Sequence, residues 1–369
     1  MKKPINKIFF VLFVSVWCLI AVLNLAKPYS DFSENENRYL AKFPVFSWSA
    51  FIEGDFMRDI DNFLNDHFIF RDAWITVQSS AEYAIGKRET NSVYIGKGSL
   101  LGKIKEPDKE VVAGNLDGLR VFSERFKKPI YLMVVPSAAA IQTQKLPDFA
   151  VPTDELTAIS DIESRSDFVR AVNISSALLE HSDEYIYYRT DHHWTTYGAY
   201  LAYAALCDTL NATPLQYSAA TVSDSFNGTL YSRSGVRFIK SDSIESFTMP
   251  FDGGCAVVSS NSTAEHTSVY FDEYLSEKDK DAYFTGPNEA IVTLYGTNHT
   301  GKKLLMFKDS YAHCFAPMLL SMYDEVTLID LRYLNSLEAY VDIDEYDEVL
   351  CLYSFETITQ QRLLNKLAY

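Results

Sequence analysis

KLLMFKDSYAHCFAPMLLSMYDEVTLID, residues 303–330, contains the alternation that indicates the fold class. It begins with a short apolar run, continues with a helix-like segment at 308–323 and ends with the strand-like EVTLID. A helix-like segment at 334–343 and a strand-like one at 348–353 repeat the pattern. Strands that are apolar throughout and alternate with helices are typical of a parallel sheet covered on both faces. We therefore predict a doubly wound, mostly parallel α/β domain.

Other segments extend this prediction in both directions along the chain. FETITQQRLLNKLA (355–368) is helix-like, IYLMVV (130–135) is strand-like, and VYIGKGSLLG (93–102) is typical of a short hairpin with Gly at its turn. In a doubly wound sheet, the site lies beyond the carboxyl ends of the strands. The residues that follow the predicted strands are Ser137, Asp309, Ser310, Asp330 to Arg332, and Ser354.

The N-terminus differs from the rest of the chain in kind. The uncharged run 8–26 has enough residues to cross a hydrocarbon core of roughly 30 Å at ~1.5 Å per residue. Lys2, Lys3 and Lys7 precede the run and only Lys27 follows it, which favours an N-terminus inside the cell. A cleaved signal peptide is the alternative, but the run is long for one and lacks an Ala-x-Ala cleavage pattern.

We therefore predict a single-pass protein of the cell membrane whose main domain is extracytoplasmic. Residues 1–7 are the predicted cytoplasmic N-terminus, and residues 8–26 are the transmembrane signal-anchor. Apolar residues of 55–86 recur at spacings of three and four, which predicts helices with a buried face. We assign 27–90 to a helical juxtamembrane stalk and 91–369 to the α/β domain.

Composition excludes several classes of function. The chain has 369 residues and a formal net charge of −16, which argues against nucleic-acid binding and against docking on anionic lipid. One of the five cysteines, Cys18, lies in the predicted anchor. The other four lack the spacing of zinc ligands, so we predict buried thiols and no metal site. These four are Cys207, Cys255, Cys314 and Cys351.

Ser310 falls where a predicted strand turns into a predicted helix. A serine there projects from a tight turn toward the positive end of a helix dipole, and free backbone N–H groups at the helix start can stabilise an oxyanion. The alternative is that Ser310 or Asp309 simply caps the helix. Position alone favours the capping role.

RTDHHWTTYGAY (189–200) changes that balance. It lies at a second predicted strand-to-helix junction, between YIYY (185–188) and a helix-like segment at 195–210. A serine that attacks an acyl carbonyl needs a base, for which histidine is well suited, and the base needs an orienting carboxylate. Asp191 and His193 offer both within three residues, so together with Ser310 they form a hydrolase-like set.

The Asp-His-His-Trp motif resembles the bacterial DHHW proteins. These are similar to the alginate O-acetyltransferase family (the AlgX and AlgJ type), whose domain resembles an SGNH hydrolase with its blocks in permuted order. The resemblance covers most of the chain after the predicted anchor. Its pieces here are ENRYLAKFP (36–44), FRDAW (70–74), VYIGKGSLLG (93–102), VVPSAAAIQTQKLP (134–147), TDHHW (190–194), FNGTLYSRSG (226–235), FTGPNEAIV (284–292), MFKDSYAHCFAPML (306–319), IDLRYL (329–334) and YSFETI (353–358).

The resemblance implies a Ser–His–Asp triad. The family's Asp-x-His-Trp pattern assigns the acid to Asp191 and the base to His193, with His192 at the variable position. The family's Asp-Ser block assigns the nucleophile to Ser310. A lysine is expected near Ala139, and its absence leaves the role of that loop open.

The resemblance also implies an oxyanion hole that uses a glycine N–H and an asparagine side chain. Gly286 and Asn288 are the first candidates, although TGPN does not reproduce a Gly-x-Asn-Asp block. Asn227 and Gly228 are the second pair of candidates.

The implied activity is acetyl transfer to, or acetyl removal from, a cell-surface or exported polysaccharide, with no cofactor. A transferase of the family would receive acetyl groups from a separate multi-spanning membrane acyltransferase. The alternative class is a non-catalytic glycan-binding or scaffold protein of a polysaccharide-modification complex.

Three alternatives concern the residues themselves. His192 is the alternative base, and the ring of His313 could also reach Ser310 from the same predicted helix. A metal site built from Asp191, His192, His193 and His313 is disfavoured, because adjacent histidines rarely reach one tetrahedral ion together.

Overall fold

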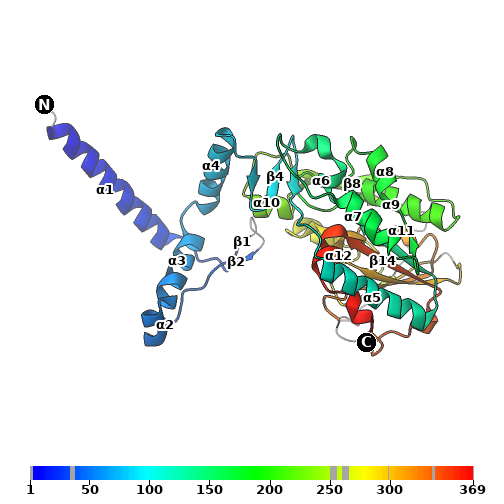
Figure 1. Cartoon of the computed structure of the whole chain (residues 1–369). Coiled ribbons are helices and arrows are strands. Elements are labelled where there is room, and N and C mark those ends of the chain that lie inside the picture. The colour runs from blue at the N-terminus through cyan, green and yellow to red at the C-terminus, as the bar shows by residue number, and fades with distance from the viewer. Residues whose placement is uncertain are drawn as a thin grey trace. The chain divides into compact units, whose positions relative to one another are not determined.

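The structure of the chain is a computed structural model (Figure 1). It describes residues 3–33, 38–249, 256–259, 266–297, 299–334 and 337–368. The contacts within the chain define two compact units, which we describe separately. The N-terminal unit comprises the residues up to Lys87 together with Tyr231–Phe238, and the main unit comprises Arg88–Leu230 and the residues from Ile239 onward. The predicted 27–90 stalk and 91–369 domain stay predictions.

A seven-stranded sheet forms the centre of the main unit, in the order β10-β11-β13-β12-β14-β6-β7. The neighbours from β13 to β7 are parallel, and β10 and β11 are antiparallel at one edge. This confirms the prediction of an α/β fold with a mostly parallel sheet. The strand bounds are β6 Ile130–Val135, β7 Arg170–Ala171, β10 Ala256–Ser259, β11 Ile291–Tyr295, β12 Lys303–Lys308, β13 Glu325–Ile329 and β14 Glu348–Ser354.

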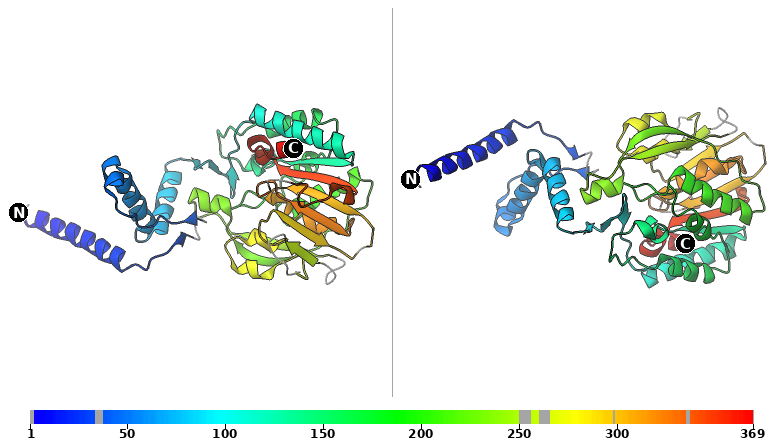
Figure 2. Two further views of the ribbon diagram at one scale, coloured as in Figure 1. Left: turned by 90° about the horizontal axis from the view of Figure 1, so that it is seen from below. Right: turned by 90° about the horizontal axis from the view of Figure 1, so that it is seen from above.

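Apolar side chains on both faces of the sheet create two cores, because successive residues of a strand point to opposite faces. Leu305 and Phe307 of β12 pack with α5, α7 and α12, whereas Leu304 and Met306 pack with α8 and α9 (Figure 2). Each core is closed by helices, as expected for strands that are apolar throughout. The helix bounds are α5 Lys109–Phe126, α7 Glu155–Ser164, α8 Ser175–Glu180, α9 Thr196–Thr209 and α12 Phe355–Gln360.

Smaller elements surround these layers. The predicted hairpin at 93–102 is confirmed as β4 and β5, which pair antiparallel and extend to β3. Strands β8 and β9 pair antiparallel, and the segment that joins them in the sequence contains Gly228 and Thr229. The bounds are β3 Glu89–Thr90, β4 Val93–Ile95, β5 Leu100–Gly102, β8 Ala219–Phe226, β9 Asp242–Phe247, α6 Ala138–Ile141, η1 Thr143–Lys145, η2 Asp272–Ser276, η3 Lys280–Tyr283 and η5 Ile343–Glu345.

The prediction of one helix over 308–323 is wrong. The segment contains a single 3-10 turn, η4 Ser310–Ala312, and a short helix, α11 Ala316–Leu319, with Pro317 in its first turn. Proline lacks an N–H group and cannot continue a helix from the preceding turn, so the backbone changes direction there. Most side chains of this segment are buried because the segment lies in the core, and their spacing is not that of a helix.

Three further local predictions need correction. The described residues of 334–343 contain no α-helix, and the 3-10 turn η5 begins only at the last residue of this segment. The helix predicted over 355–368 ends at Gln360 and is followed by the 3-10 turn η6 Leu364–Ala368. YIYY (185–188) contributes one isolated bridge, Tyr187 to Trp194, and no strand.

The N-terminal unit consists mainly of helices. The prediction of helices over 55–86 is confirmed by α3 and α4, but the predicted buried face is wrong. Leu64 and Trp74 are exposed, and the buried residues of these two helices are Asp66 and Ser79. In the part of the chain that the structure describes, one helix is long and apolar enough to cross a membrane, over Lys7–Asn24. The bounds are α1 Lys3–Ala26, α2 Trp48–Glu53, α3 Asp55–His67, α4 Arg71–Ala84, α10 Thr229–Ser234, β1 Phe32–Ser33 and β2 Arg38–Tyr39.

The cysteines agree with the sequence prediction where they are described. Cys207, Cys314 and Cys351 are free and buried, and Cys18 is free and exposed in α1. The prediction for Cys255 lies outside the described residues.

Candidate active site

The DHHW segment forms a tight loop immediately before α9. Thr195 caps this helix, because its hydroxyl accepts a hydrogen bond from the Gly198 N–H at 3.2 Å. The indole of Trp194 is fully buried, and its Nε1 donates to the carbonyl oxygen of Tyr311 at 3.0 Å. The Tyr311 hydroxyl donates back to the carbonyl oxygen of His192 at 2.5 Å. Two hydrogen bonds therefore join the DHHW loop to the turn that carries Ser310.

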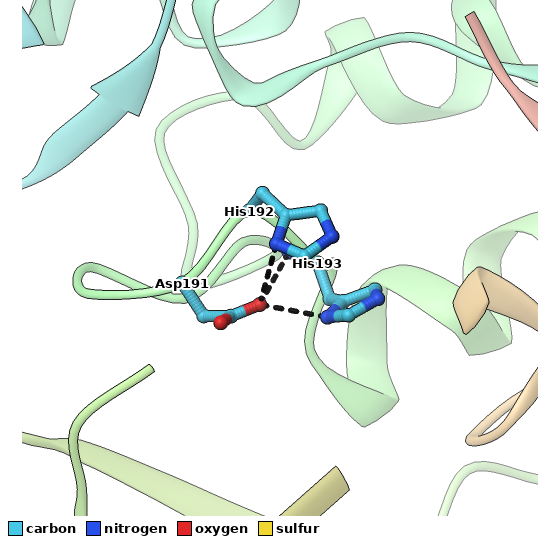
Figure 3. Close-up of side chains that lie close together, drawn as sticks. All are labelled: Asp191, His192 and His193. Carbon is cyan, nitrogen blue, oxygen red and sulfur yellow. Dashed lines mark hydrogen bonds and ion pairs between the residues drawn. The ribbon is translucent and has the colours of Figure 1, made fainter. Parts of the chain in front are cut away.

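Ser310, His193 and Asp191 form a continuous hydrogen-bonded row. Nε2 of His193 lies 2.8 Å from Ser310 Oγ, and Nδ1 lies 2.7 Å from Asp191 Oδ1. Figure 3 shows the Asp191 carboxylate directed at the rings of His192 and His193. The same carboxylate oxygen accepts the backbone N–H of His193 at 2.9 Å, so it fixes both the ring and the main chain. The structure thus brings together the three residues assigned to a triad from sequence.

The segment after β8 holds Asp191 in place. Oδ2 of Asp191 accepts from the Thr229 backbone N–H at 2.6 Å and from its hydroxyl at 3.0 Å. The backbone of Gly228 lies so close that a Cβ atom there would stand 2.2 Å from Asp191 Oδ2. Any side chain at residue 228 would therefore displace the carboxylate. Sequence analysis quoted this segment but did not single out Thr229.

Asp242 of β9 fixes the other side of the DHHW loop. Its Oδ1 accepts the Arg189 N–H at 2.7 Å, and its Oδ2 accepts the N–H and the hydroxyl of Thr190 at 2.8 and 2.5 Å. Asp242 is completely buried, so these bonds act without competition from water. Sequence analysis missed this residue, because an isolated aspartate in a polar strand has no local signature.

Charge–charge interactions control the protonation of the row. Burial opposes a charged imidazole, but the carboxylates of Asp281 and Asp191 outweigh it and raise the pKa of His193 to about 9. Burial raises the pKa of Asp191, but the neighbouring imidazoles of His192 and His193 hold it well below the usual value. Burial raises the pKa of Asp281 to about 7. Near neutral pH, the row therefore rests as an imidazolium–carboxylate pair.

His192, the alternative base, lies on the open side of the loop. Its Nδ1 is 2.8 Å from the Thr229 hydroxyl and 3.3 Å from Asp191 Oδ1. Its side chain is 37% exposed, whereas that of His193 is 8% exposed. A small pocket adjoins this face. The polar side chains that line it belong to Ser137, His192, Tyr311, Ser354 and Glu356.

His313 belongs to a different set of contacts. Its Nδ1 lies 3.0 Å from the Phe284 carbonyl oxygen, so this nitrogen carries the proton and donates. Its Nε2 lies 3.1 Å from Lys308 Nζ and accepts from the ammonium. Burial, reinforced by the positive charge of Lys308, lowers the pKa of His313 well below its usual value. The ring is therefore neutral and engaged with Lys308.

Lys308 is the centre of a buried polar network that sequence analysis missed. Its side chain is 3% exposed, and Nζ lies 3.3 Å from Asn288 Oδ1 and 3.7 Å from Asp330 Oδ2. Asp330 also pairs with Arg332, whose guanidinium Nη2 donates to Oδ2 at 2.6 Å. Burial lowers the pKa of Lys308, and the Asp330 carboxylate opposes that shift. The network joins the ends of β12 and β13 to the loop that contains Asn288.

The turn at Ser310 is built by Asp309. Oδ1 of Asp309 accepts the Tyr311 N–H at 3.1 Å, and Oδ2 accepts the Ser354 N–H at 2.8 Å. Asp309 is thus the cap, and the Ser310 hydroxyl is left to face His193. The expected long helix dipole is absent, because only the three-residue turn η4 begins here and few peptide units are aligned.

Ser137, a second predicted strand-end serine, has a structural partner. The Ser137 hydroxyl and N–H donate to the Glu155 carboxylate at 2.5 and 2.9 Å. Burial raises the pKa of Glu155 to about 7, although the Ser137 hydrogen bonds oppose the shift.

The four oxyanion candidates lie in two places. Gly286 has φ +85° and precedes Asn288, whose Oδ1 is engaged by Lys308. Asn227 accepts from the Ser241 hydroxyl at 3.0 Å, and the Gly228 N–H donates to the Thr190 hydroxyl at 3.1 Å. Their role as oxyanion donors stays a prediction.

Asp191, His192 and His193 lie close enough together to hold a metal ion. Two atoms bound at ~2.0 Å to one tetrahedral zinc ion lie ~3.3 Å apart. Asp191 Oδ1 and His193 Nδ1 are 2.7 Å apart, which is a hydrogen-bond distance. The other nitrogen of His193 faces Ser310, so this geometry favours proton transfer over metal binding.

Known structures share the fold of about three quarters of the chain. A crystal structure of a DHHW family protein from Eubacterium siraeum is 24% identical with a TM-score of 0.66, and the match covers 75% of this chain and 95% of that chain. Bacillus cereus PatB1 is 17% identical with a TM-score of 0.60, covering 73% of this chain and 98% of that chain. PatB1 is also known with a sulfonyl adduct, at 16% identity and a TM-score of 0.59, covering 75% and 100%.

A further structure, the O-acetyltransferase domain of Pseudomonas putida AlgJ, is 14% identical with a TM-score of 0.47, covering 73% of this chain and 93% of that chain. No curated protein matches the chain. The family model described as DHHW protein matches residues 121–329, more than half of the chain, including both the DHHW loop and Ser310. The chain therefore belongs to the DHHW family.

Proposed function

We propose that the chain is a membrane-anchored, extracytoplasmic O-acetyltransferase or acetylesterase with an SGNH hydrolase-like domain in permuted order. Its substrate would be a cell-surface or exported polysaccharide. The observation that carries the proposal is the row Ser310–His193–Asp191, with heavy-atom distances of 2.8 and 2.7 Å. Such a row satisfies the geometric requirement for an activated serine nucleophile.

The chemistry would proceed in two acyl-transfer steps. Ser310 Oγ attacks the acetyl carbonyl carbon while His193 Nε2 takes its proton, and His193 then gives that proton to the departing alkoxide. The acetyl group is left on Ser310 as an ester. A sugar hydroxyl, or water, next attacks this ester while His193 removes its proton, and Ser310 leaves and is reprotonated. Transfer and hydrolysis differ only in this second acceptor.

Asp191 would orient and stabilise the base. Its hydrogen bond to Nδ1 directs Nε2 at Ser310, and its charge stabilises the imidazolium that forms during attack. Thr229 holds the carboxylate by two hydrogen bonds, so the acid cannot rotate away from the ring.

The apolar helix α1 supports the membrane part of the proposal. Its span Lys7–Asn24 has the length and composition of a membrane-crossing helix, and lysines precede it. An anchored domain would be well placed to receive acetyl groups from a multi-spanning membrane acyltransferase, which is the proposed partner.

Covalent labelling tests the nucleophile directly. PatB1, a protein with this fold, is known with a sulfonyl adduct. We expect a sulfonyl fluoride or fluorophosphonate probe to modify Ser310, as located by mass spectrometry of the digested protein. Ser310→Ala and His193→Ala should both abolish labelling at this position. Labelling of a different serine, or none in the folded protein, would count for a non-catalytic glycan-binding or scaffold role.

The choice of base is tested by a pair of variants. His193→Ala should lose acetylesterase activity on an aryl acetate, whereas His192→Ala should keep most of it. The opposite result would assign the base to His192. Stoichiometric zinc in the purified protein would replace the serine mechanism with a metal-dependent one.

A further inference from the structure

The helices α2 to α4 of the N-terminal unit present many large apolar side chains to the outside. Trp48 is 71% exposed and Ile52 is 80% exposed, and α2 contains no buried residue. Soluble proteins rarely expose large contiguous apolar surfaces, and such a surface marks an interaction site. The members of this apolar surface are Phe43, Val45, Phe46, Trp48, Phe51, Ile52, Met57, Leu64, Phe70, Trp74 and Val77.

The aromatic rings of this surface contact one another. The ring of Phe46 lies with its centroid 5.3 Å from that of Trp48 and 5.2 Å from that of Phe56, and Phe51 lies 6.2 Å from Trp48. The rings therefore form one continuous patch across the junction of α2 and α3. They are not scattered single residues of the kind that any surface carries.

Hydrogen bonds connect the turn between α3 and α4 to the end of α1. Oδ1 of Asn24 accepts the Ile69 N–H at 2.8 Å. Nζ of Lys27 lies 3.4 and 3.5 Å from the carbonyl oxygens of His67 and Phe68. The ring of Tyr29 stacks on that of His67 at 4.9 Å. The α3–α4 turn is therefore held at the residue where the apolar span ends.

An apolar groove continues from α1 onto α3. It is lined on one side by Trp17, Ile20 and Ala21 of α1, and on the other by Phe63 and Leu64 of α3. A bilayer that surrounds α1 would extend along this groove, because both walls are apolar and open. Leu64 belongs both to this groove and to the apolar surface, so the two adjoin at α3.

We propose that α2–α4 lie in the interfacial layer of the membrane, with the apolar surface at the boundary between headgroups and acyl chains. This inference rests on the anchor in the proposed function. If α1 crosses the bilayer, Asn24 and Lys27 lie at the interface, and the bonded α3–α4 turn lies there too. Tryptophan and other amphipathic aromatic residues favour this depth, and amphipathic helices bury their apolar face roughly 5–10 Å into it.

The charges of α3 select the kind of lipid. The helix has four aspartates and only Arg58 as a permanent cation. Acidic side chains are repelled by anionic headgroups, so the apolar surface fits zwitterionic or uncharged lipid. The previously predicted stalk, which would stand away from the bilayer, is replaced in this proposal by helices that lie on it.

Tryptophan quenching in vesicles of brominated phosphatidylcholine tests the proposal. The chain has four tryptophans, and Trp194 is fully buried. In the full-length double variant Trp17→Phe, Trp74→Phe, the fluorescence above the Trp194 background comes from Trp48. In the double variant Trp48→Phe, Trp74→Phe, it comes from Trp17. The triple variant that lacks all three supplies the Trp194 baseline. Equal far-ultraviolet circular dichroism would establish that all three variants are folded.

We expect bromines near the headgroup end of the acyl chains to quench Trp48 at least about twofold more than deep bromines do. Trp17 lies seven residues before Asn24, ~10 Å along the helix, so deep bromines should quench it more strongly. Quenching of Trp17 without quenching of Trp48 would overturn the interfacial proposal and leave the anchor intact. Quenching of neither would remove the anchor and the proposal together. A Trp48 shielded from both bromolipid and aqueous iodide would show that a protein covers the surface, which also overturns the proposal.

Discussion

Two buried histidines flank the Ser310 turn, and their pKa values shift in opposite directions. His193 faces the carboxylates of Asp191 and Asp281, which raise its pKa to about 9 against the effect of burial. His313 faces the ammonium of Lys308, which adds to burial and lowers its pKa well below the usual value. Burial alone would keep both rings neutral, so the neighbouring charge decides the protonation state.

The comparison separates the histidine of the proposed triad from a histidine whose contacts are structural. His193 has one nitrogen on Ser310 and one on an acid, so a proton can move along the row. His313 has one nitrogen on a backbone carbonyl oxygen and one on an ammonium, so both of its bonding positions are occupied. Histidine identity and closeness to a serine are therefore insufficient to assign a base.

The largest expected difference is in catalysis. His193→Ala should lower kcat for acetate ester hydrolysis by ~10⁴–10⁶-fold, because the nucleophile loses its base. His313→Ala should retain activity within about tenfold and lower the free energy of unfolding by about 1–3 kcal/mol, because the Lys308 ammonium loses an acceptor. Initial rates and urea unfolding measure the two effects. Equal loss of activity in both variants would refute the division of roles.

The acid is tested next. Asp191→Asn should lower kcat by about 10³–10⁴-fold with little change in KM, because an amide stabilises neither the imidazolium nor the required tautomer. The matched control is Asp242→Asn, which perturbs the same loop but does not contact the ring. It should affect stability more than the chemical step. An Asp191→Asn variant with near-normal kcat would remove this residue from the catalytic row.

The two halves of the site were not equally predictable from sequence. Asp191 and His193 are two residues apart, so their contact is local, and Ser310 follows a strand whose apolar run is plain in the sequence. Lys308, Thr229 and Asp242 acquire their roles from segments that meet only in the fold. An isolated lysine or aspartate has no periodicity that would mark it.

The fold shows the same division. Continuous apolar runs predicted β6, β12, β13 and β14, because strands buried on both faces need such runs. The same apolar character misled the helix prediction at 308–323, where the chain is buried in turns. Burial and helical periodicity look alike in a short segment that is apolar throughout.

The buried ammonium gives the next prediction. Lys308→Met should lower the free energy of unfolding by about 2–3 kcal/mol, because His313 and Asn288 lose their common donor. Asp330 keeps its pairing with Arg332, which limits the loss. The control Lys303→Met removes a half-exposed lysine from the other end of β12 and should cost at most about 1 kcal/mol. If Lys308→Met and Lys303→Met shift the urea midpoint equally, the buried network around Lys308 does not stabilise the fold more than a surface ion pair does.

The smallest expected effect is a shift in the pH dependence of kcat/KM. It depends on the negative charge of Asp281, which faces His193. The base must be unprotonated, so kcat/KM should rise with pH up to about 9, the pKa of His193. Asp281 raises this pKa only while ionised, hence above its own pKa of about 7. Asp281→Asn removes that charge, so the rising limb should move to lower pH, toward the ordinary histidine value.

Each unit of that displacement would raise the unprotonated fraction at neutral pH about tenfold. The kcat/KM of the variant would then exceed that of the unmodified protein near pH 7. The two values would be equal at high pH, where His193 is unprotonated in both proteins. Asp148→Asn, which removes a well-exposed acid, is the matched control and should leave the profile in place. If kcat/KM of Asp281→Asn rises at the same pH as that of the unmodified protein, Asp191 alone sets the protonation of His193. The contrast between the pKa values of His193 and His313 would then depend on one carboxylate.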